Sequence, residues 1–241
     1  MDLIKAAEEM KAFIGSYTNT DRIDLKGSIL NQDFLDAYSD VDMEIYLNDS
    51  STVDMKGLIK ALNQQFGTVF GYEIHSHESQ DVLRICLANM LRFDLTFVYP
   101  GAKKPCPTNS AAPDAIDSVV NQFWFMSAMV LAKLGRRDYL IAAHLALELC
   151  QLIIVVQMLH RDAEKGTNVH RFGDGEDVPV LRSLVRLGND NAPVEGSTRD
   201  DILSALFNAA ECMDKMCLRL GMDYAAKCTE LKTAYFESHG R

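Results

Sequence analysis

The feature that constrains the fold most is a change in hydrophobic pattern near residue 105. Before this point, short apolar or alternating runs are interleaved with helical patterns at 3–13 and 53–66. After it, the apolar residues follow helical spacing throughout. The segment 101–114, GAKKPCPTNSAAPD, separates the halves and holds three of the six prolines. Because proline interrupts helices and sheets, we place a boundary here, between a first domain, 1–108, and a second, 109–241.

Each half carries its own secondary-structure signals. The strand-like runs of the first half are short and bounded by turn residues, and they cover 22–26, 41–47, 68–74, 82–87 and 91–98. Interleaved with the helical patterns, they predict an α/β arrangement. In the second half, one helix is predicted to open at 113–114 and close at Gly135, and another to open at 197–198 and close at Gly221. We expect four or five helices there, with a loop at the glycine-rich segment 167–177.

Composition and charge exclude several classes of function. With 48% hydrophobic and 24% charged residues, the chain is neither disordered nor collagen-like. A net charge of −10 and a pI near 5.0 argue against nucleic-acid binding, because no basic groove is visible in the sequence. Residues 1–50 hold 11 acidic against 4 basic side chains, so a cleft in this region would attract metal ions or cationic small molecules.

The expected location of the protein is the cytoplasm. The six cysteines form no CxxC pair and lie mostly in apolar runs, as buried thiols do in a reducing compartment, and they predict no structural zinc. Glu8, Glu9 and Lys11 interrupt the apolar core that a secretion signal needs. The longest apolar run, 139–159, is broken by histidine, glutamate and glutamine side chains. We therefore expect no transmembrane span and no association with a membrane.

The most informative stretch for chemistry is 25–47, LKGSILNQDFLDAYSDVDMEIYL. It continues from a short apolar strand through Gly27 and Ser28 at a tight turn, and it enters a second strand at Asp40 and Asp42. Because side chains alternate along a strand, these two aspartates share one face. A small residue at a strand-to-helix turn lets backbone N–H groups approach a phosphate. Gly27 and Ser28 are therefore candidate phosphate-binding residues.

A third carboxylate comes from the strand predicted at 91–98. Alternation places its apolar residues in the core and directs Arg92 and Asp94 outward. If this strand is adjacent to the earlier one, Asp94 joins Asp40 and Asp42. Three converging carboxylates repel one another unless divalent cations lie among them, and Mg²⁺ prefers such oxygen ligands. With phosphates held at the turn, the group suits in-line displacement at a nucleotide α-phosphate, with pyrophosphate leaving.

These residues resemble the signature of the nucleotidyltransferase superfamily with the polymerase-β-type fold, which is Gly-Ser, a spacer, Asp-x-Asp and an acidic residue on a later strand. The helical segment 121–148 resembles more narrowly the antibiotic nucleotidyltransferases, especially aminoglycoside 6-adenylyltransferases and lincosamide nucleotidyltransferases. The resemblance implies an α+β fold, in which a polymerase-β-like α/β domain with a mixed sheet precedes a C-terminal helical bundle that binds the substrate. The chain departs from the family at Ile29 and Leu30, where many members carry arginine.

The resemblance also implies a reaction. An enzyme with two Mg²⁺ ions would transfer a nucleoside monophosphate, AMP from ATP or the equivalent group of another nucleoside triphosphate, to a hydroxyl of a small molecule. The acceptor would be an aminoglycoside or lincosamide, which gives antibiotic resistance, and the acidic first domain favours a cationic one. Asp40, Asp42 and Asp94 would hold the metal, and the turn at Gly27 and Ser28 would bind phosphates. The base that takes the hydroxyl proton is left open between Asp94 and Glu148 (all numbered in this sequence).

Several histidines have competing interpretations. Glu148 lies one helical turn after His144 in an apolar run, so a buried pair is either a core contact or a base facing the acceptor. His75 and His77 have the spacing of two strand metal ligands, but no third ligand is near in sequence. The pair at 170–171, His-Arg, is expected to be a solvated loop rather than a triphosphate contact.

Two hypotheses from other functional classes stay open. The chain can be a nucleotidyltransferase that modifies a partner protein in a two-component, toxin–antitoxin-like system, in which case the helical domain exposes an apolar docking patch. It can also be a nucleotide-binding module without turnover, as the missing arginine allows. The sequence leaves the oligomeric state open, and a homodimer with a shared active site is the favoured state.

Overall fold

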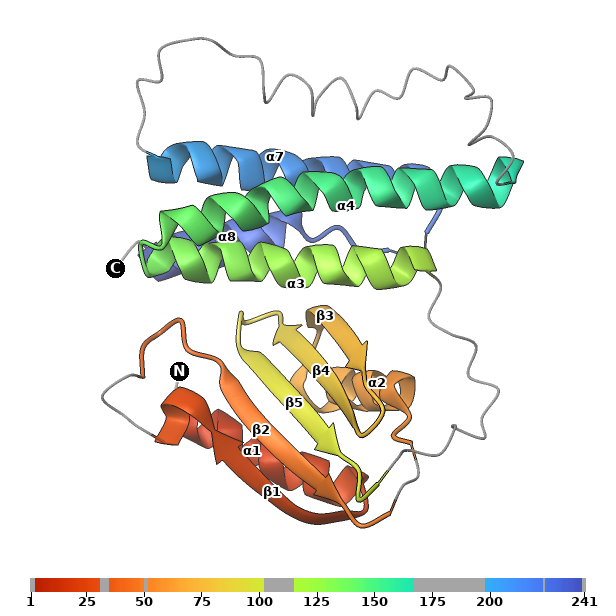
Figure 1. Ribbon diagram of the computed structural model, residues 1–241. Coiled ribbons are helices and arrows are strands. Elements are labelled where there is room, and N and C mark those ends of the chain that lie inside the picture. The colour runs from red at the N-terminus through yellow and green to blue at the C-terminus, as the bar shows by residue number, and fades with distance from the viewer. Residues whose placement is uncertain are drawn as a thin grey trace. The chain divides into compact units, whose positions relative to one another are not determined.

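The computed structural model describes residues 3–30, 35–49, 52–101, 115–166, 198–222 and 224–239. The chain divides into two compact units, Met1–Pro113 and Asp114–Arg241, which are considered separately below (Figure 1). The boundary predicted between residues 108 and 109 falls in 102–114, outside the described residues. The α+β class, with a mixed sheet followed by a helical region, is confirmed.

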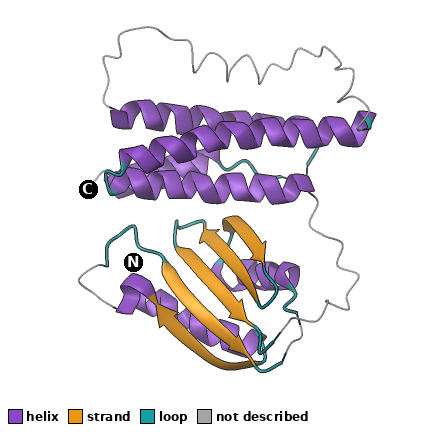
Figure 2. Ribbon diagram, in the orientation of Figure 1, coloured by secondary structure: helices purple, strands orange, loops and turns teal. Residues whose placement is uncertain are grey.

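The first unit is built around a five-stranded sheet (Figure 2). Its elements are α1 (Leu3–Tyr17), β1 (Thr20–Lys26), the short 3-10 helix η1 (Gly27–Leu30), β2 (Val41–Leu47), α2 (Met55–Phe66), β3 (Val69–Ser76), β4 (Gln80–Leu87) and β5 (Arg92–Val98). All five strand-like runs of the sequence form strands, in the order β1-β2-β5-β4-β3. The pair β2 and β5 is parallel and the other neighbours are antiparallel, so the sheet is mixed.

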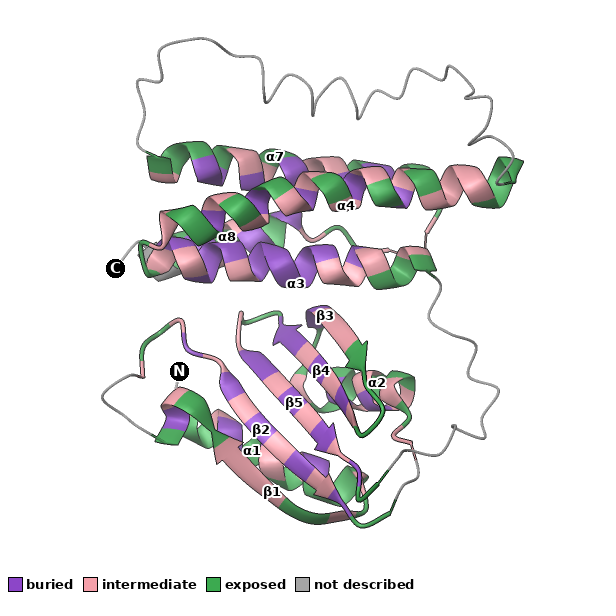
Figure 3. Cartoon of the chain, in the orientation of Figure 1, coloured by how far each residue is buried: buried purple, intermediate pink, exposed green. Residues whose placement is uncertain are grey.

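The two faces of this sheet differ in chemistry. One face is apolar, because residues such as Val41, Met43 and Ile45 of β2 are buried and alternate with less buried ones (Figure 3). These residues form one core with the buried side chains of α1 and α2, which are Ala7, Met10, Ile14, Leu58 and Leu62. The opposite face carries charged residues at the alternating positions of β2, β4 and β5. We call it the polar face, defined by Asp42, Glu44, Arg84 and Asp94.

A buried hydrogen bond at the end of β5 provides a test of this core. The Tyr99 hydroxyl donates to Asp81 Oδ2 at 2.6 Å and accepts from the Val53 backbone N–H at 3.2 Å. Tyr99→Phe removes the donor from a buried carboxylate, so we expect the free energy of unfolding to fall by about 1–3 kcal/mol. Urea unfolding followed by circular dichroism measures the change. The control is Tyr46→Phe, whose hydroxyl donates at 2.6 Å to the less buried Glu44, and equal losses in the two variants would contradict the prediction.

The regular elements described in the second unit are all helices, as predicted. It comprises α3 (Ala115–Gly135), α4 (Tyr139–Lys165), α7 (Thr198–Arg219) and α8 (Cys228–His239). Helix α3 ends at Gly135 as expected, and α7 ends just before Gly221, whose φ of 68° is the left-handed conformation that glycine adopts at helix ends. The loop predicted at 167–177 lies outside the described residues.

Helices α3 and α4 are both long and apolar enough to cross a membrane, judged by length and composition alone. Of the most apolar stretch, 56% is buried within the protein in α3 and 28% in α4. The exposed part of α4 carries large apolar side chains, which are Leu140, Ile141, Leu147, Val155 and Met158. Core helices of water-soluble proteins pass the same test, so the absence of a transmembrane span stays a prediction.

Candidate functional site

The pairing of β2 with β5 brings two of the predicted carboxylates together. The two strands are parallel, and their register places Asp42 directly beside Asp94. Both residues are on the polar face, because their chain neighbours on each side are buried in the core. Asp40 lies in the loop just before β2, close enough for its charge to act on both aspartates. The adjacency on which the sequence argument depended is therefore present.

Gly27 follows β1 and closely approaches the Asp42 side chain. Its φ is 65°, and a Cβ atom at this position would lie 2.2 Å from Asp42 Oδ2. Any larger residue would thus displace the carboxylate or the turn. This contact is a different role from the phosphate binding proposed from the sequence. Ser28 is half-buried in η1, a 3-10 turn of four residues. The helix expected to begin at Gly27 and Ser28 is described only as this turn, because 31–34 are outside the described residues.

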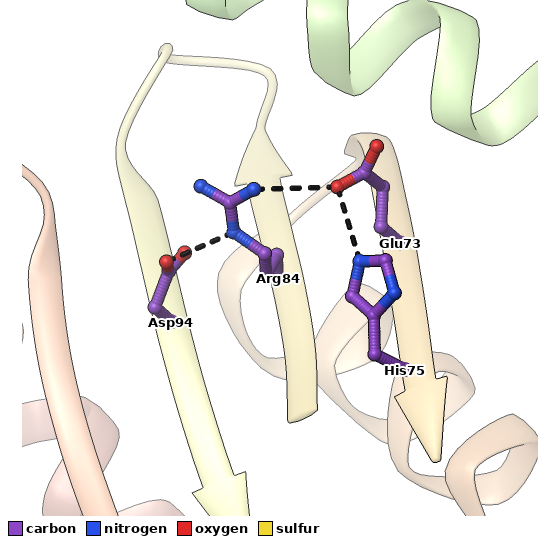
Figure 4. A network of polar contacts seen from close by, with 4 residues as sticks. All are labelled: Glu73, His75, Arg84 and Asp94. Carbon is purple, nitrogen blue, oxygen red and sulfur yellow. Dashed lines mark hydrogen bonds and ion pairs between the residues drawn. The ribbon is translucent and has the colours of Figure 1, made fainter. Parts of the chain in front are cut away.

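An arginine on β4 holds the Asp94 carboxylate (Figure 4). Arg84 is the cross-strand partner of Asp94 in the antiparallel pair of β4 and β5, and its Nε lies 2.9 Å from Asp94 Oδ2. On its other side, Arg84 Nη1 lies 3.4 Å from Glu73 Oε2 of β3. His75 Nε2 approaches the same Glu73 oxygen at 3.5 Å. Three neighbouring strands therefore contribute one line of alternating charges to the polar face.

Arg92 departs from the predicted pattern of β5. It was expected to face outward with Asp94, but only 4% of its surface is exposed. Its Nη2 donates a hydrogen bond to the backbone carbonyl of Tyr38, in the loop that precedes β2. Arg92 is buried because this loop lies against the first residue of β5 and its carbonyl accepts a hydrogen bond from the guanidinium. Arg92 thereby ties the segment that carries Asp40 to the strand that carries Asp94.

The environment of Asp42 and Asp94 raises the pKa of both carboxyl groups. Burial raises the pKa of Asp42, and repulsion by Asp40 and Asp94 raises it further, against the opposing effect of Arg84 and Arg92. Burial also raises the pKa of Asp94, although the contact with Arg84 opposes this shift. Asp94 Oδ1 is buried and accepts no hydrogen bond from any residue in the described ranges. An added cation would therefore stabilise the ionised forms of these groups.

This donor set suits a hard divalent cation, although it does not form a complete metal site by itself. Asp42 and Asp94 supply carboxylate oxygens side by side, and Asp94 Oδ1 is an orphaned acceptor of the kind that Mg²⁺ prefers. Within the described part of the chain, no three His, Cys, Asp or Glu side chains are already arranged to hold a metal ion. Water and phosphate oxygens would therefore have to provide much of the coordination, as is usual for Mg²⁺.

The remaining sequence candidates lie on other elements than β2 and β5. Glu148 is on α4 in the second unit, and its Oε1 lies 3.5 Å from His144 Nε2. The expectation of a buried pair is wrong, because 68% of the His144 side chain and 39% of the Glu148 side chain are exposed. Both face away from the apolar residues through which α4 packs. His75 and His77 are exposed, and the pair at 170–171 lies outside the described residues.

The sequence argument missed Arg84 and Glu73. Alternation within 82–87 already places Arg84 on the outward face of its strand. The short segment between β4 and β5 predicts an antiparallel hairpin, and pairing the strands through it would have set Arg84 opposite Asp94. The sequence therefore contains a signal for Arg84, but placing it opposite Asp94 requires the register of β4 and β5. Glu73 required the further pairing of β3 with β4.

Comparison with family models and with curated proteins finds no match to this chain. Among solved structures, the chain is similar to an aminoglycoside 6-adenyltransferase from Bacillus subtilis, with a TM-score of 0.37 and 16% sequence identity. The match covers 96% of this chain and 97% of that one. A likeness at this level assigns neither a substrate nor the role of any residue.

Proposed function

We propose that this protein is a nucleotidyltransferase that transfers a nucleoside monophosphate, AMP from ATP in the favoured case, to a hydroxyl group of a small molecule. The observation that carries the proposal is the register of β2 and β5, which sets Asp42 beside Asp94 on the polar face. The Gly27 turn against Asp42 supports it, because a backbone without a side chain is needed where it approaches the carboxylate. A solvated strand face would require no such contact.

In the proposed reaction, Asp40, Asp42 and Asp94 hold Mg²⁺, with two ions as the expected number. Bound there, Mg²⁺ neutralises charge on the triphosphate and makes the acceptor hydroxyl more acidic. The acceptor oxygen forms a bond to the α-phosphorus, and the bond from this phosphorus to the bridging oxygen of the β-phosphate breaks, so pyrophosphate leaves. The turn at Gly27 and Ser28 orients the phosphates. Of the two candidate bases, we favour Asp94, because it lies beside Asp42 and its Oδ1 has no hydrogen-bond partner in the described part of the chain, whereas Glu148 is partly exposed and paired with His144.

The charge of the first unit supports a cationic acceptor. The first 50 residues carry 11 acidic and 4 basic side chains. Asp42 and Glu44 of the polar face are among these acidic residues, and Asp94 lies beside Asp42. A cationic acceptor such as an aminoglycoside would be attracted to such a surface, more strongly than a less charged lincosamide. The same charge supports the absence of a nucleic-acid substrate.

Pyrophosphate release tests the proposal. The intact protein is incubated with Mg·ATP or Mg·GTP and a panel of aminoglycosides and lincosamides, beside Asp42→Asn and the control Asp24→Asn. Asp24 is on β1, where it pairs with Arg22 at 3.2 Å and lies opposite Glu44, two residues along β2 from Asp42. We expect release that depends on one acceptor, is lost in Asp42→Asn and is retained in Asp24→Asn. Acceptor-dependent release that survives Asp42→Asn would refute the assigned site.

A partner protein is the second candidate acceptor, and the surface of α4 favours it. Leu140 is 85% exposed and Leu147 is 67% exposed, and helical spacing places them on one side of the helix. Transfer of label from α-³²P-ATP to a polypeptide in a cell extract would favour this candidate if it is lost in Leu147→Glu but retained in Leu218→Glu, at an exposed leucine of α7. Label that moves only to small molecules would exclude it.

A further inference from the structure

Arg84 occupies the middle of the charged line on the polar face (Figure 4). It contacts Asp94 Oδ2 through Nε at 2.9 Å and Glu73 Oε2 through Nη1 at 3.4 Å. The Asp94 side chain is only 22% exposed, so this ion pair is shielded from water more than a surface pair is. The contact also distinguishes the two oxygens of Asp94. Oδ2 is held by Arg84, whereas Oδ1 is buried and has no hydrogen-bond partner in the described part of the chain.

We propose that Arg84 is a positioning residue with two linked effects, an inference that rests on the proposed nucleotidyl transfer at this site. It fixes the orientation of Asp94, so that Oδ1 is the oxygen presented to the incoming cation or hydroxyl proton. It also supplies a resident positive charge among the carboxylates, which stabilises the metal-free protein and opposes the entry of a divalent ion. Arg84 therefore improves the geometry for turnover at the expense of metal affinity.

The side chain must be arginine for the first of these effects. Its planar guanidinium presents donors in two directions at once, and here they reach carboxylates on the strands at either side of β4. Glu73 fixes the far end of the guanidinium, so the near end can hold Asp94 in one orientation. Lysine would keep the charge, but its single ammonium group cannot bridge the two carboxylates with the same fixed geometry.

The second effect predicts a direction of change in metal affinity that loss of a purely structural residue would not produce. Removing a positive charge near a cation site strengthens divalent binding, whereas removing a residue that only maintains the fold of the site would weaken it. Arg84→Met removes both the charge and the bridge, so metal affinity should rise while turnover falls. Arg84→Lys removes the bridge alone, so metal affinity should stay near that of the wild type while turnover still falls. Arg92 stays in place in both variants and keeps the loop before β2 attached.

The experiment measures Mn²⁺ binding to the intact protein without nucleotide by electron paramagnetic resonance, together with kcat and KM for pyrophosphate release. The variants are Arg84→Met, Arg84→Lys and Glu73→Gln, which loosens the far end of the bridge. Arg22→Met is the matched control, because Arg22 is an arginine of the same sheet that pairs with Asp24 at 3.2 Å and lies opposite Tyr46, four residues along β2 from Asp42. Circular dichroism verifies that each variant is folded.

In Arg84→Met we expect about tenfold tighter Mn²⁺ binding and a kcat about 30-fold lower, within the range found when groups that orient metal ligands are removed. Arg84→Lys should bind Mn²⁺ as the wild type does, with a kcat that is lowered without a matching change in KM. Glu73→Gln should also lower kcat, and Arg22→Met should change neither kcat nor Mn²⁺ affinity.

Weaker Mn²⁺ binding in a folded Arg84→Met protein, or an unchanged kcat in it, would overturn the proposal. If Arg84→Met does not fold, Arg84→Lys with wild-type kcat would overturn it as well. A wild-type protein that releases no pyrophosphate with any acceptor refutes the proposed function instead. In that case the Mn²⁺ titrations still decide whether the Arg84 charge opposes the divalent ion.

Discussion

Asp42→Asn is expected to lower the rate of pyrophosphate release by about 1,000-fold, which corresponds to about 4 kcal/mol of transition-state stabilisation. The amide keeps the size of the side chain but removes the negative charge beside Asp94. The same change is expected to raise the thermal stability of the metal-free protein, because burial and two neighbouring carboxylates destabilise the ionised Asp42. Steady-state kinetics and a thermal melt in EDTA measure the two effects.

A loss of activity with a rise in stability distinguishes a functional carboxylate from a structural one. Asp24→Asn is the control, and both its activity and its melting temperature should stay close to those of the wild type. Mg²⁺ should raise the melting temperature of the wild type and of Asp24→Asn, but not that of Asp42→Asn. An Asp42→Asn protein that is less stable than the wild type in EDTA would contradict the assigned role.

The contribution of Asp42 and Asp94 to the stability of the metal-free protein should fall as the pH rises above about 4, the ordinary range of aspartate. The pKa values of Asp42 and Asp94 are raised in the folded state, so between the ordinary and the raised values the folded protein binds more protons than the unfolded one. The contribution of these two groups then decreases with pH through this window. Urea unfolding in EDTA at several pH values measures the slope of stability against pH, which should be more negative in the wild type than in Asp42→Asn. An equal slope in both proteins would exclude Asp42 as its source.

Gly27→Ala is expected to reduce the rate of pyrophosphate release by about 100-fold, which is the effect of misplacing a catalytic group by about 1 Å. The added Cβ would lie 2.2 Å from Asp42 Oδ2, so the carboxylate must move. The positive φ of 65° adds a backbone cost of about 1 kcal/mol for any residue other than glycine. Kinetics and urea unfolding of the same preparation separate the two contributions.

Gly67→Ala is the matched control for this variant. Gly67 lies in the same unit and has a φ of 87°, but a Cβ there would meet no atom within 4 Å. It should show the backbone cost in stability without the loss of activity. If Gly67→Ala lost as much activity as Gly27→Ala, the effect would arise from general destabilisation and not from displacement of Asp42.

The sequence predicted the carboxylate pair because strand periodicity is a local property. Alternation in 41–47 was enough to place Asp42 on one face and Met43 on the other, and the structure confirms it. The adjacency of Asp42 and Asp94 was stated as a condition, since a parallel pairing of strands separated by 44 residues leaves no local signal. The helical half was predicted because its apolar spacing and glycine stops are also local.

The parts that the sequence did not predict depend on contacts between elements. Arg92 sits at an outward position of β5, but a loop carbonyl takes up its guanidinium, and pattern alone could not show this. Arg84 required the β4 and β5 register. Glu148 was expected to be buried because its neighbours in sequence are apolar, but α4 buries only part of its circumference. Apolar composition predicts that a helix forms, but it does not predict which face of the helix is buried against the rest of the protein.

The most direct test of the central claim is a calorimetric titration of ATP into the intact protein, with Mg²⁺ and then with EDTA. The claim is that Asp42 and Asp94, with the Gly27 turn, form a site for a metal-bound nucleoside triphosphate. We predict binding that requires Mg²⁺, disappears in Asp42→Asn and persists in Asp24→Asn. ATP binding that is the same in EDTA and in Asp42→Asn, or no binding of ATP to the wild-type protein, would contradict the claim.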